Sequence, residues 1–277
     1  MLTNSPRIRI LTTVKHHNAE HRANVFKVWA AYWRAQLHQT PRWDFMCELI
    51  HRLLTQALAA HGLEPKRFLE AGCGTGRVSH RLAEAGIETH LIDRTPEAIS
   101  LSRSLSTAHC TCHHVLGSCC QMPYASDTFD LVFNEGVLEH LPEDDQREFL
   151  AEMIRVVRPG GLVVTMNPYA YSWLYRLGKA VLEAIGRWPY GYEEPVRTLR
   201  NMVDGATLVR EYSGGFLIIV SELFSRLLPV RGARAIVHRF AIRAYRARAV
   251  RALDALLARL FGGYLLVSVF RKHETPQ

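Results

Sequence analysis

A glycine-rich turn follows a short apolar segment in the first third of the chain. It reads Leu-Glu-Ala-Gly-Cys-Gly-Thr-Gly over residues 69–76, with glycine at every second position from Gly72. Glycines spaced in this way let the backbone turn sharply and approach a ligand without intervening side chains. A helix that begins at the turn would present its N-terminus to the same ligand. We therefore expect a ligand to bind over this turn.

The residues around the turn narrow the class of ligand. A dinucleotide-binding turn has a third glycine three residues after the second, and Arg77 occupies that position here. No Gly-Lys-Ser or Gly-Lys-Thr follows, which a phosphate-binding Walker loop would need. Glu70 stands just before the turn, and its carboxylate would repel a pyrophosphate but attract an ammonium group. The turn therefore favours a ligand with a positive end and no phosphate.

Asp93 is the second candidate binding residue. It ends the next apolar segment, 17 residues after Gly76, where a carboxylate can accept hydrogen bonds from both ribose hydroxyls of a nucleoside. The alternative is a turn aspartate that caps the following helix, which the neighbouring Thr95 and Pro96 would suit. The interval after a glycine turn favours ribose binding.

Short apolar runs alternate with amphipathic stretches around these residues. We predict strands at residues 67–71, 89–92, 111–116, 129–133 and 162–166, and helices at residues 78–85, 96–105 and 146–157. Helices within residues 20–60 precede them, and strands at 207–212 and 264–270 flank a later helical insertion. Alternation of this kind implies parallel strands joined by crossover helices. The predicted fold class is α/β: a doubly wound, mostly parallel, seven-stranded Rossmann-like sheet with N-terminal helices and a helical insertion before the last strand.

The composition agrees with a packed protein. The 277 residues are 48% hydrophobic and 22% charged, which excludes a disordered chain, a collagen and a coiled-coil rod. The six cysteines are too few for a disulfide scaffold, and no apolar run approaches the ~20 residues of a membrane span. We expect a cytoplasmic protein with reduced thiols. The segment Cys110–His114 with Cys119 and Cys120 has metal-binding residue types but no Cys-x2-Cys pair, so no metal site is predicted.

The net charge of +8 is concentrated in one segment. Between Glu222 and Asp254 there is no acid, but there are eight arginines, from Arg226 to Arg251. Apolar residues recur there at three- and four-residue steps, as in an amphipathic helix. Such a helix can contact an anionic membrane surface, an acidic substrate or nucleic acid, or simply face solvent. The sequence leaves these alternatives open.

Further segments resemble, in order, the motifs of the class I S-adenosylmethionine-dependent methyltransferases of the small-molecule type. After the glycine turn and Asp93 come Gly-Ser-Cys-Cys-Gln-Met-Pro-Tyr at 117–124, Phe-Asp-Leu-Val at 129–132, Gly-Val-Leu-Glu-His-Leu at 136–141, and Arg-Val-Val-Arg-Pro-Gly-Gly-Leu at 155–162. The resemblance runs from about Phe68 to Asn167. It implies four regions within one globular domain: an N-terminal helical cap (1–62), the cofactor-binding core (63–168), a helical and aromatic acceptor-side region (169–206), and late strands with a basic helical insert (207–277).

The resemblance also implies where each part of S-adenosylmethionine would lie. The residues around its methionine part would be Glu70, Gly72, Cys73, Gly74, Gly76 and Asn134. Asn134 would lie beneath the methionine end, close to the sulfonium. Asp93 would bind the ribose, the Arg94 side chain would lie near the adenine, and the main chain of Cys119 would meet the adenine edge. Ser118 stands where the family usually has an aspartate that accepts from the adenine amino group. A serine hydroxyl accepts without charge, so we expect weaker adenine binding.

Methyl transfer by in-line displacement needs an aligned acceptor and, for some acceptors, a base. His140 is the first candidate base because imidazole titrates near neutrality, although a Leu-Glu-His run in this family is often structural. Glu135, Tyr190, Tyr192 and Glu194 are the other candidates. Aromatic residues from 169 to 192 would either enclose a flat acceptor or cap the core.

The implied function is therefore a methyltransferase (EC 2.1.1 class) acting on a small-molecule or lipid-like acceptor, with Arg226–Arg251 as a candidate contact to an anionic membrane surface. One alternative is an RNA or other nucleic-acid methyltransferase that binds phosphates through these arginines. It is less favoured, because the chain reads Asn-Glu-Gly at 134–136 and lacks the Asn-Pro-Pro-Tyr type motif of amino-methylating DNA enzymes. The other alternative is a non-catalytic adapter that docks on a membrane or partner.

Overall fold

The computed structural model describes residues 23–38, 41–107, 110–227 and 233–274, and in these ranges seven strands form one sheet. The strands are β1 (Arg67–Ala71), β2 (Glu88–Asp93), β3 (Cys112–Leu116), β4 (Phe129–Glu135), β5 (Val157–Pro168), β6 (Ala206–Gly214) and β7 (Leu265–Lys272). Their order is β3-β2-β1-β4-β5-β7-β6. Only β7 is antiparallel to its neighbours β5 and β6 among these strands. The predicted mostly parallel, doubly wound sheet is confirmed.

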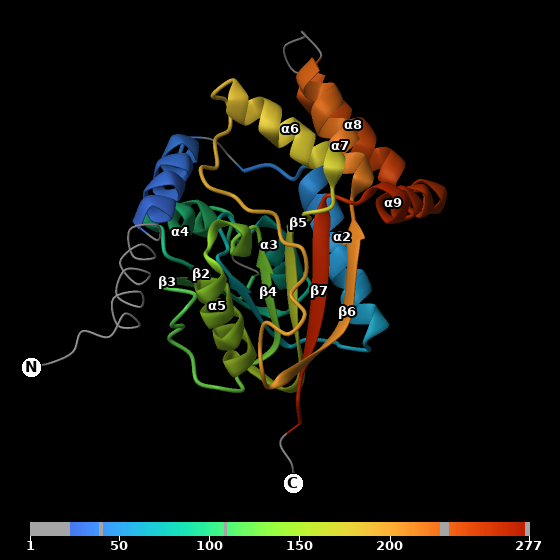
Figure 1. Ribbon diagram of the computed structural model, residues 1–277. Helices are drawn as coiled ribbons and strands as arrows, with labels where there is room; N and C mark the ends of the chain where they lie inside the picture. The colour runs from blue at the N-terminus through green and yellow to red at the C-terminus, as the bar shows by residue number, and fades with distance from the viewer. Residues whose placement is uncertain (1–22, 39–40, 108–109, 228–232, 275–277) are drawn as a thin grey trace, which may run out of the picture.

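Helices cover both faces of this sheet (Figure 1). They are α2 (Phe45–Ala60), α3 (Arg77–Glu84), α4 (Pro96–Arg103), the 3-10 turn η1 (Leu138–His140), α5 (Glu143–Val156), α6 (Trp173–Ala184), α7 (Phe216–Leu227), α8 (Ala233–Tyr245) and α9 (Arg248–Phe261). A further helix spans residues 23–36. One face carries a core built with apolar residues of α2, α3, α7 and α8. The other face carries a core built with α5.

The alternation of side chains along each buried strand produces these two cores. In β4, Leu131 and Phe133 belong to the core beneath α2, whereas Phe129 and Val132 belong to the core beneath α5. Strand side chains point to opposite faces with a period of two, and burial on both faces explains the continuous apolar run of β4. Phe129 joins the α5 side because a register shift lies between it and Leu131.

That register shift also explains why β5 is longer than predicted. The sequence places Pro159, Gly160 and Gly161 before the strand, but the structure includes them in it. Pairing with β4 moves from Val157 directly to Leu162, so the residues between form a bulge. A Cβ on Gly161 would lie 2.8 Å from the carbonyl oxygen of Asp130, so glycine lets the two strands approach here.

The N-terminal and late helices gather at the end of the sheet where the parallel strands finish. Figure 1 shows α6, α7, α8 and α9 at the upper end of the sheet and helix 23–36 at the same end, beside α4. The Arg34 guanidinium donates to Glu97 of α4 at 2.7 and 3.1 Å. Helix 23–36 therefore lies against the mouth of the sheet, although the sequence predicts only that it is helical.

The predicted helical insertion before β7 consists of three helices, α7 to α9, rather than one. Asp254 of α9, which is 3% exposed, joins them. Its carboxylate accepts the N–H of Leu217 in α7 at 2.7 Å and the hydroxyl of Tyr245 in α8 at 2.8 Å. No helix among the described residues is both long and apolar enough to cross a membrane.

We expect Asp254→Ala to destabilise the protein. The change leaves two buried donors unpaired, at about 1–3 kcal/mol each, so the free energy of unfolding should fall by roughly 2–4 kcal/mol in denaturant titrations. The exposed Asp204→Ala should change it by less than about 0.5 kcal/mol. Equal stability of the two variants would show that Asp254 does not hold the three helices together.

Candidate active site

A cavity of about 330 Å³ opens at the carboxyl ends of the parallel strands. Its walls come from the turn after β1, the ends of β2 and β4, residues 118–120 after β3, η1, residues 190–193 and helix 23–36. Open α/β sheets bind ligands outside the carboxyl ends of their strands, and the volume suits a small organic ligand. The fold therefore brings most of the predicted site residues to one place.

The glycine turn has the backbone that its sequence predicts. Gly72, Gly74 and Gly76 have φ values of +74°, +51° and +60°, in the left-handed region that favours glycine. A Cβ on Gly72 would lie 2.5 Å from the Val137 side chain, and one on Gly74 would lie 2.7 Å from the Trp33 ring. Gly72 and Gly74 line the cavity. Gly76 does not line the cavity and is the N-cap of α3, and its contact with the ligand stays a prediction.

Asp93 holds the turn by hydrogen bonds, and its contact with a ribose stays a prediction. It lines the cavity and is 8% exposed. One carboxylate oxygen accepts the N–H of Gly74 at 2.9 Å, and the other accepts both the N–H and the hydroxyl of Thr95, at 2.8 and 2.7 Å. Three accepted bonds leave acceptor capacity on a carboxylate with about four lone-pair positions. Asp93 thus shapes the turn and keeps an oxygen available to a ligand.

Glu70 and Asn134 lie at the end of the turn closest to β4. Glu70 is 6% exposed, lines the cavity and accepts the Ser79 hydroxyl. Burial raises the pKa of Glu70 to about 8. Asn134 is fully buried and does not line the cavity; its amide donates to the carbonyl oxygen of Ala71 at 2.7 Å. Asn134 therefore supports the turn from beneath, and its contact with the ligand stays a prediction.

The residues predicted to bind adenine form the opposite wall. Arg94, Ser118 and Cys119 all line the cavity. The Arg94 guanidinium lies over the Phe26 ring, 5.1 Å from its centroid, and the Ser118 hydroxyl accepts the N–H of Cys120 at 3.3 Å. Burial raises the pKa of the Cys119 thiol, so this wall carries a neutral sulfur at physiological pH.

His140 lies in the cavity wall, 4% exposed. Its Nδ1 donates to the carbonyl oxygen of Tyr192 at 2.6 Å, and its Nε2 lies 3.8 Å from Glu139 Oε1. The bond to a carbonyl fixes the neutral tautomer, with the lone pair on Nε2. Its ring packs edge-on against Trp29, with centroids 5.1 Å apart. The structure therefore supplies an oriented imidazole where the sequence predicts a base.

The other candidate bases differ in position. Glu135 and Tyr190 line the cavity, and burial raises the pKa of Glu135 to about 7. The Tyr192 side chain is 49% exposed and its hydroxyl donates to Glu194 at 2.8 Å. Neither Tyr192 nor Glu194 lines the cavity. The main chain of Tyr192 reaches the site through its bond with His140, and a catalytic role of its side chain stays a prediction.

Several cavity residues were not predicted to belong to the site. Helix 23–36 contributes aromatic side chains, and two acids and a tyrosine come from other segments: Phe26, Trp29, Tyr32, Trp33, Glu139, Glu193 and Tyr264. The spacing of the aromatic residues indicates one helix face, and it gives no indication of what that face covers. Glu139 stands beside His140 in the Leu-Glu-His run, which is the one local signal for it.

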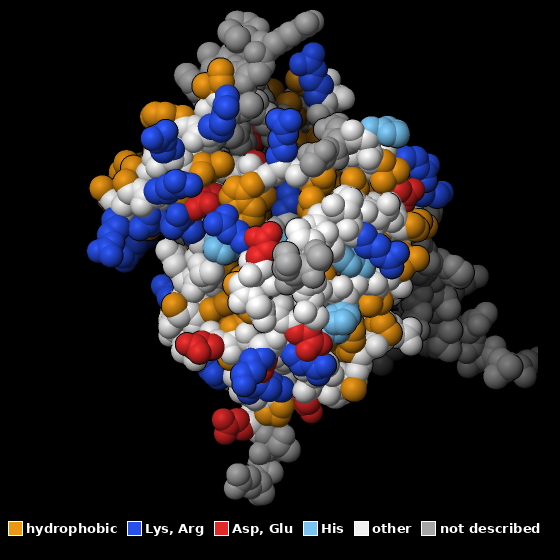
Figure 2. Space-filling view, turned by 180° about the vertical axis from the view of Figure 1, so that it is seen from behind, with side chains coloured by type: hydrophobic (Ala, Val, Ile, Leu, Met, Phe, Trp, Pro, Cys, Tyr) orange, Lys and Arg blue, Asp and Glu red, His pale blue; other side chains and the backbone are white. Residues whose placement is uncertain are grey.

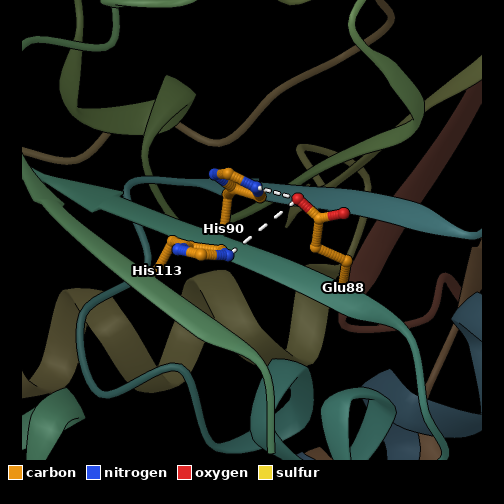
Figure 3. Close-up of side chains that lie close together, drawn as sticks. All are labelled: Glu88, His90 and His113. Atoms are coloured by element: carbon orange, nitrogen blue, oxygen red, sulfur yellow. Dashed lines mark hydrogen bonds and ion pairs between the residues drawn. The ribbon is translucent and has the colours of Figure 1, made fainter.

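A separate cluster lies on the strands away from the cavity (Figure 3). Glu88 Oε1 is 3.0 Å from His90 Nε2 and 3.9 Å from His113 Nε2. Three such residues can hold a metal ion, but Arg67 donates to both oxygens of Glu88, at 3.0 and 3.1 Å. This pairing and the bond with His90 lower the pKa of Glu88 to about 2. The arrangement is an ion-pair network, and the absence of a metal site stays a prediction.

Comparisons with known proteins address the same region of the chain. A family profile described as a methyltransferase domain matches residues 69–165. Residues 69–165 form a class I S-adenosylmethionine-dependent methyltransferase domain. The segment contains the turn, Asp93 and His140, but not helix 23–36 or the chain beyond β5.

Relatives of the methyltransferase domain include a malonyl-[acyl-carrier protein] O-methyltransferase of Serratia marcescens, 34% identical over 115 residues, which are 42% of this chain and 43% of the relative. A norajmaline N-methyltransferase of Rauvolfia serpentina is 33% identical over 112 residues, 39% of this chain and 37% of the relative. The chain thus spans less than half the length of these two curated relatives.

A solved structure shares the fold over a longer stretch. The N-methyltransferase NodS of Bradyrhizobium japonicum, in complex with S-adenosyl-L-homocysteine, has a TM-score of 0.54 at 18% identity. The match covers 89% of this chain and 99% of that one. The methyltransferase fold therefore extends through β6 and β7.

The contact between the turn and Trp33 can be tested with a matched pair of glycines. Gly74→Ala and Gly86→Ala both place a side chain at left-handed φ, at a cost of about 1–2 kcal/mol each. Nothing lies within 4 Å of a Cβ on Gly86, whereas a Cβ on Gly74 overlaps the Trp33 ring. Only Gly74→Ala should change the tryptophan emission and weaken S-adenosylmethionine binding in calorimetry. Identical emission and affinity in the two variants would contradict this geometry.

Proposed function

We propose that the protein transfers a methyl group from S-adenosylmethionine to a small-molecule acceptor by in-line displacement. The observation that carries the proposal is a single cavity whose walls include the glycine turn and Asp93 at one side and His140 and Tyr190 at the other. Cofactor-binding and acceptor-side residues therefore share one space. The relatives named as a malonyl-[acyl-carrier protein] O-methyltransferase and a norajmaline N-methyltransferase support a small acceptor rather than a nucleic acid.

The residues present fit this cofactor. Glu70 is a buried carboxyl group whose pKa is raised by burial, and an ammonium group would compensate its charge. Gly72 and Gly74 leave space that a Cβ would fill. Asp93 retains acceptor capacity for ribose hydroxyls. When bound, S-adenosylmethionine supplies an electrophilic methyl group on a positively charged sulfur.

His140 is the residue we propose to handle the acceptor's proton. Its Nε2 carries the lone pair because Nδ1 donates to the Tyr192 carbonyl. The ring is held by Trp29, so it stays aligned without a rotational cost during the reaction. Glu135, whose pKa burial raises to about 7, is a second group that can hold a proton near neutral pH.

A second part of the proposal concerns the surface made by α6, α8 and α9, which we call the helical end. Its exposed apolar side chains are Trp173, Leu177, Val181, Ile185, Ile236, Phe240, Leu253, Leu256, Leu260 and Phe261. Exposed arginines interleave with them, including Arg243, Arg246 and Arg248. Figure 2 shows hydrophobic and basic side chains interspersed on this part of the surface.

We propose that the helical end contacts an anionic membrane surface. Apolar side chains beside arginines suit the boundary between headgroups and acyl chains. Phe240 is 74% exposed and Leu260 is 63% exposed. Such apolar exposure gives no advantage on a phosphate backbone, so it favours a lipid surface over the nucleic-acid alternative. A lipid-like acceptor would then reach the cavity from the same end of the sheet.

The charge of Glu70 makes cofactor binding depend on pH. Burial raises the pKa of Glu70 to about 8, and an ammonium group binds the ionised form of this carboxyl group, so binding releases a proton. Affinity for S-adenosylmethionine should rise by up to about tenfold per pH unit from pH 6 toward 8. It should level off near pH 8, where the ligand's own amino group begins to lose its proton.

Calorimetry across this pH range tests both cofactor binding and the role of Glu70. Glu70→Gln should lose most of the pH dependence, whereas the exposed Glu64→Gln should keep it. A pH-independent affinity in the unmodified protein would remove Glu70 from ammonium binding. If neither S-adenosylmethionine nor its demethylated product binds, the proposed function is wrong.

Vesicle sedimentation tests the helical end. The protein should sediment with phosphatidylglycerol vesicles, less with phosphatidylcholine vesicles, and less as salt screens the arginines. Phe240→Ser should reduce sedimentation several-fold because it removes apolar contact, whereas Leu116→Ser should not. Leu116 is 56% exposed but lies on β3, at the opposite edge of the sheet. No sedimentation at low salt would exclude membrane contact.

A further inference from the structure

Three acids beyond Glu70 and Asp93 line the cavity: Glu135, Glu139 and Glu193. Glu139 is 2% exposed and Glu193 is 9% exposed. Glu193 accepts the Tyr175 hydroxyl. Glu139 Oε2 has no hydrogen-bond partner among the described residues. A buried carboxyl oxygen without a partner is costly, so its presence in a cavity wall indicates a ligand group that pairs with it.

Aromatic rings line the same cavity as this carboxyl group. His140, the neighbour of Glu139, packs against Trp29. Trp29 in turn stacks on Tyr190, with centroids 5.7 Å apart and planes 20° from parallel, and Tyr32 lies 5.5 Å from Tyr190. The faces of tryptophan and tyrosine rings attract cations, above all substituted ammonium groups. Rings and a carboxyl group together suit a cationic, partly apolar ligand.

The positive side chains in the wall do not offset these acids for an incoming anion. Among the described lining residues the arginines are Arg77 and Arg94. Arg77 donates to the Asp44 carboxylate at 2.9 Å and to the Arg42 carbonyl. Arg94 lies over Phe26 at the adenine side. A carboxylate or phosphate acceptor would therefore meet the Glu139 carboxyl group next to His140, and neither arginine acts on that group.

We infer that the methyl acceptor is an amine, bound at Glu139 under the rings of Trp29 and Tyr190. This inference rests on the proposed function and specifies its substrate class. It uses the unpartnered Glu139 oxygen and the aromatic wall, neither of which the cofactor residues engage.

The reaction balances with these groups alone. On binding, the proton of the Glu139 carboxyl group moves to the amine and forms an ammonium–carboxylate pair. The proton returns to Glu139 when the nitrogen lone pair attacks the methyl carbon. A nitrogen–carbon bond forms, the carbon–sulfur bond breaks, and its electron pair stays on sulfur as a neutral thioether. The positive charge moves from sulfur to the methylated nitrogen, still within reach of Glu139.

The first test measures recognition without turnover. Benzyltrimethylammonium, which has no lone pair to methylate, and benzyl alcohol are titrated into the full-length protein with S-adenosylhomocysteine present, and tryptophan emission is followed. We expect the cation to bind at least tenfold more tightly than the alcohol. Glu139→Gln should remove that preference and the exposed Glu64→Gln should keep it. Equal affinity for cation and alcohol in the unmodified protein would overturn the inference.

The second test measures methyl transfer from labelled S-adenosylmethionine to matched amines, alcohols and carboxylic acids. Label in amines, reduced at least tenfold by Glu139→Gln with S-adenosylmethionine binding retained, supports the inference. Label in alcohols or acids instead of amines overturns it and leaves the proposed function intact. Failure to bind S-adenosylmethionine overturns the proposed function itself. If no member of the panel is labelled, the relative affinity for benzyltrimethylammonium and benzyl alcohol in the first test decides whether the inference holds.

Discussion

Hydrogen bonds with the neighbouring strands fix the backbone of the turn between β1 and α3. The rest of the site depends on this turn. The carbonyl oxygen of Ile92 accepts the N–H of Gly72 at 2.8 Å, and Asp93 accepts that of Gly74. Asn134 of β4 holds the carbonyl of Ala71 from the other side. Because β1 lies between β2 and β4, one left-handed turn is fixed from both sides, and a ligand can approach bare backbone.

Burial of carboxyl groups makes the cavity favour ligands that carry a positive charge. The pKa of Glu70 is about 8 and that of Glu135 about 7, and burial raises that of Glu139 well above its ordinary range. Each group is costly to ionise while the cavity is empty, and each gains when a positive group arrives. The proposed cofactor and the proposed acceptor both bring such a charge, so the same physical cause links the two proposals.

The helical end and the cavity lie at the same end of the sheet because of the directions of the last two strands. β7 is antiparallel between β5 and β6, so the chain between β6 and β7 begins and ends at the carboxyl edge of the parallel strands. The insertion α7 to α9 therefore lies at the same end of the sheet as the cavity. Asp254, the acid that ends the arginine-rich stretch, is buried as the shared acceptor of the three helices.

Some predicted site residues do not line the cavity, for identifiable reasons. Asn134 and Glu135 are adjacent on β4, and strand alternation directs only Glu135 to the cavity. Gly76 ends the turn as a helix N-cap, so its glycine serves the backbone and the contact with Leu91 rather than a ligand. Tyr192 contributes its carbonyl oxygen to His140 while its ring faces outward.

The sequence alone determined the alternating fold, the glycine turn, Asp93 and the family, because strand and helix periodicity and turn geometry are local properties of the chain. Tertiary structure alone decided that helix 23–36 forms a cavity wall, that Glu139 and Glu193 face the same space, and that Trp29 stacks on Tyr190. Trp29 and Tyr190 are 161 positions apart in the sequence, and Glu139 and Glu193 are 54 positions apart. Many faces of the chain are apolar to a similar degree, and tertiary packing decides which of them contact one another. A local sequence pattern does not indicate those contacts.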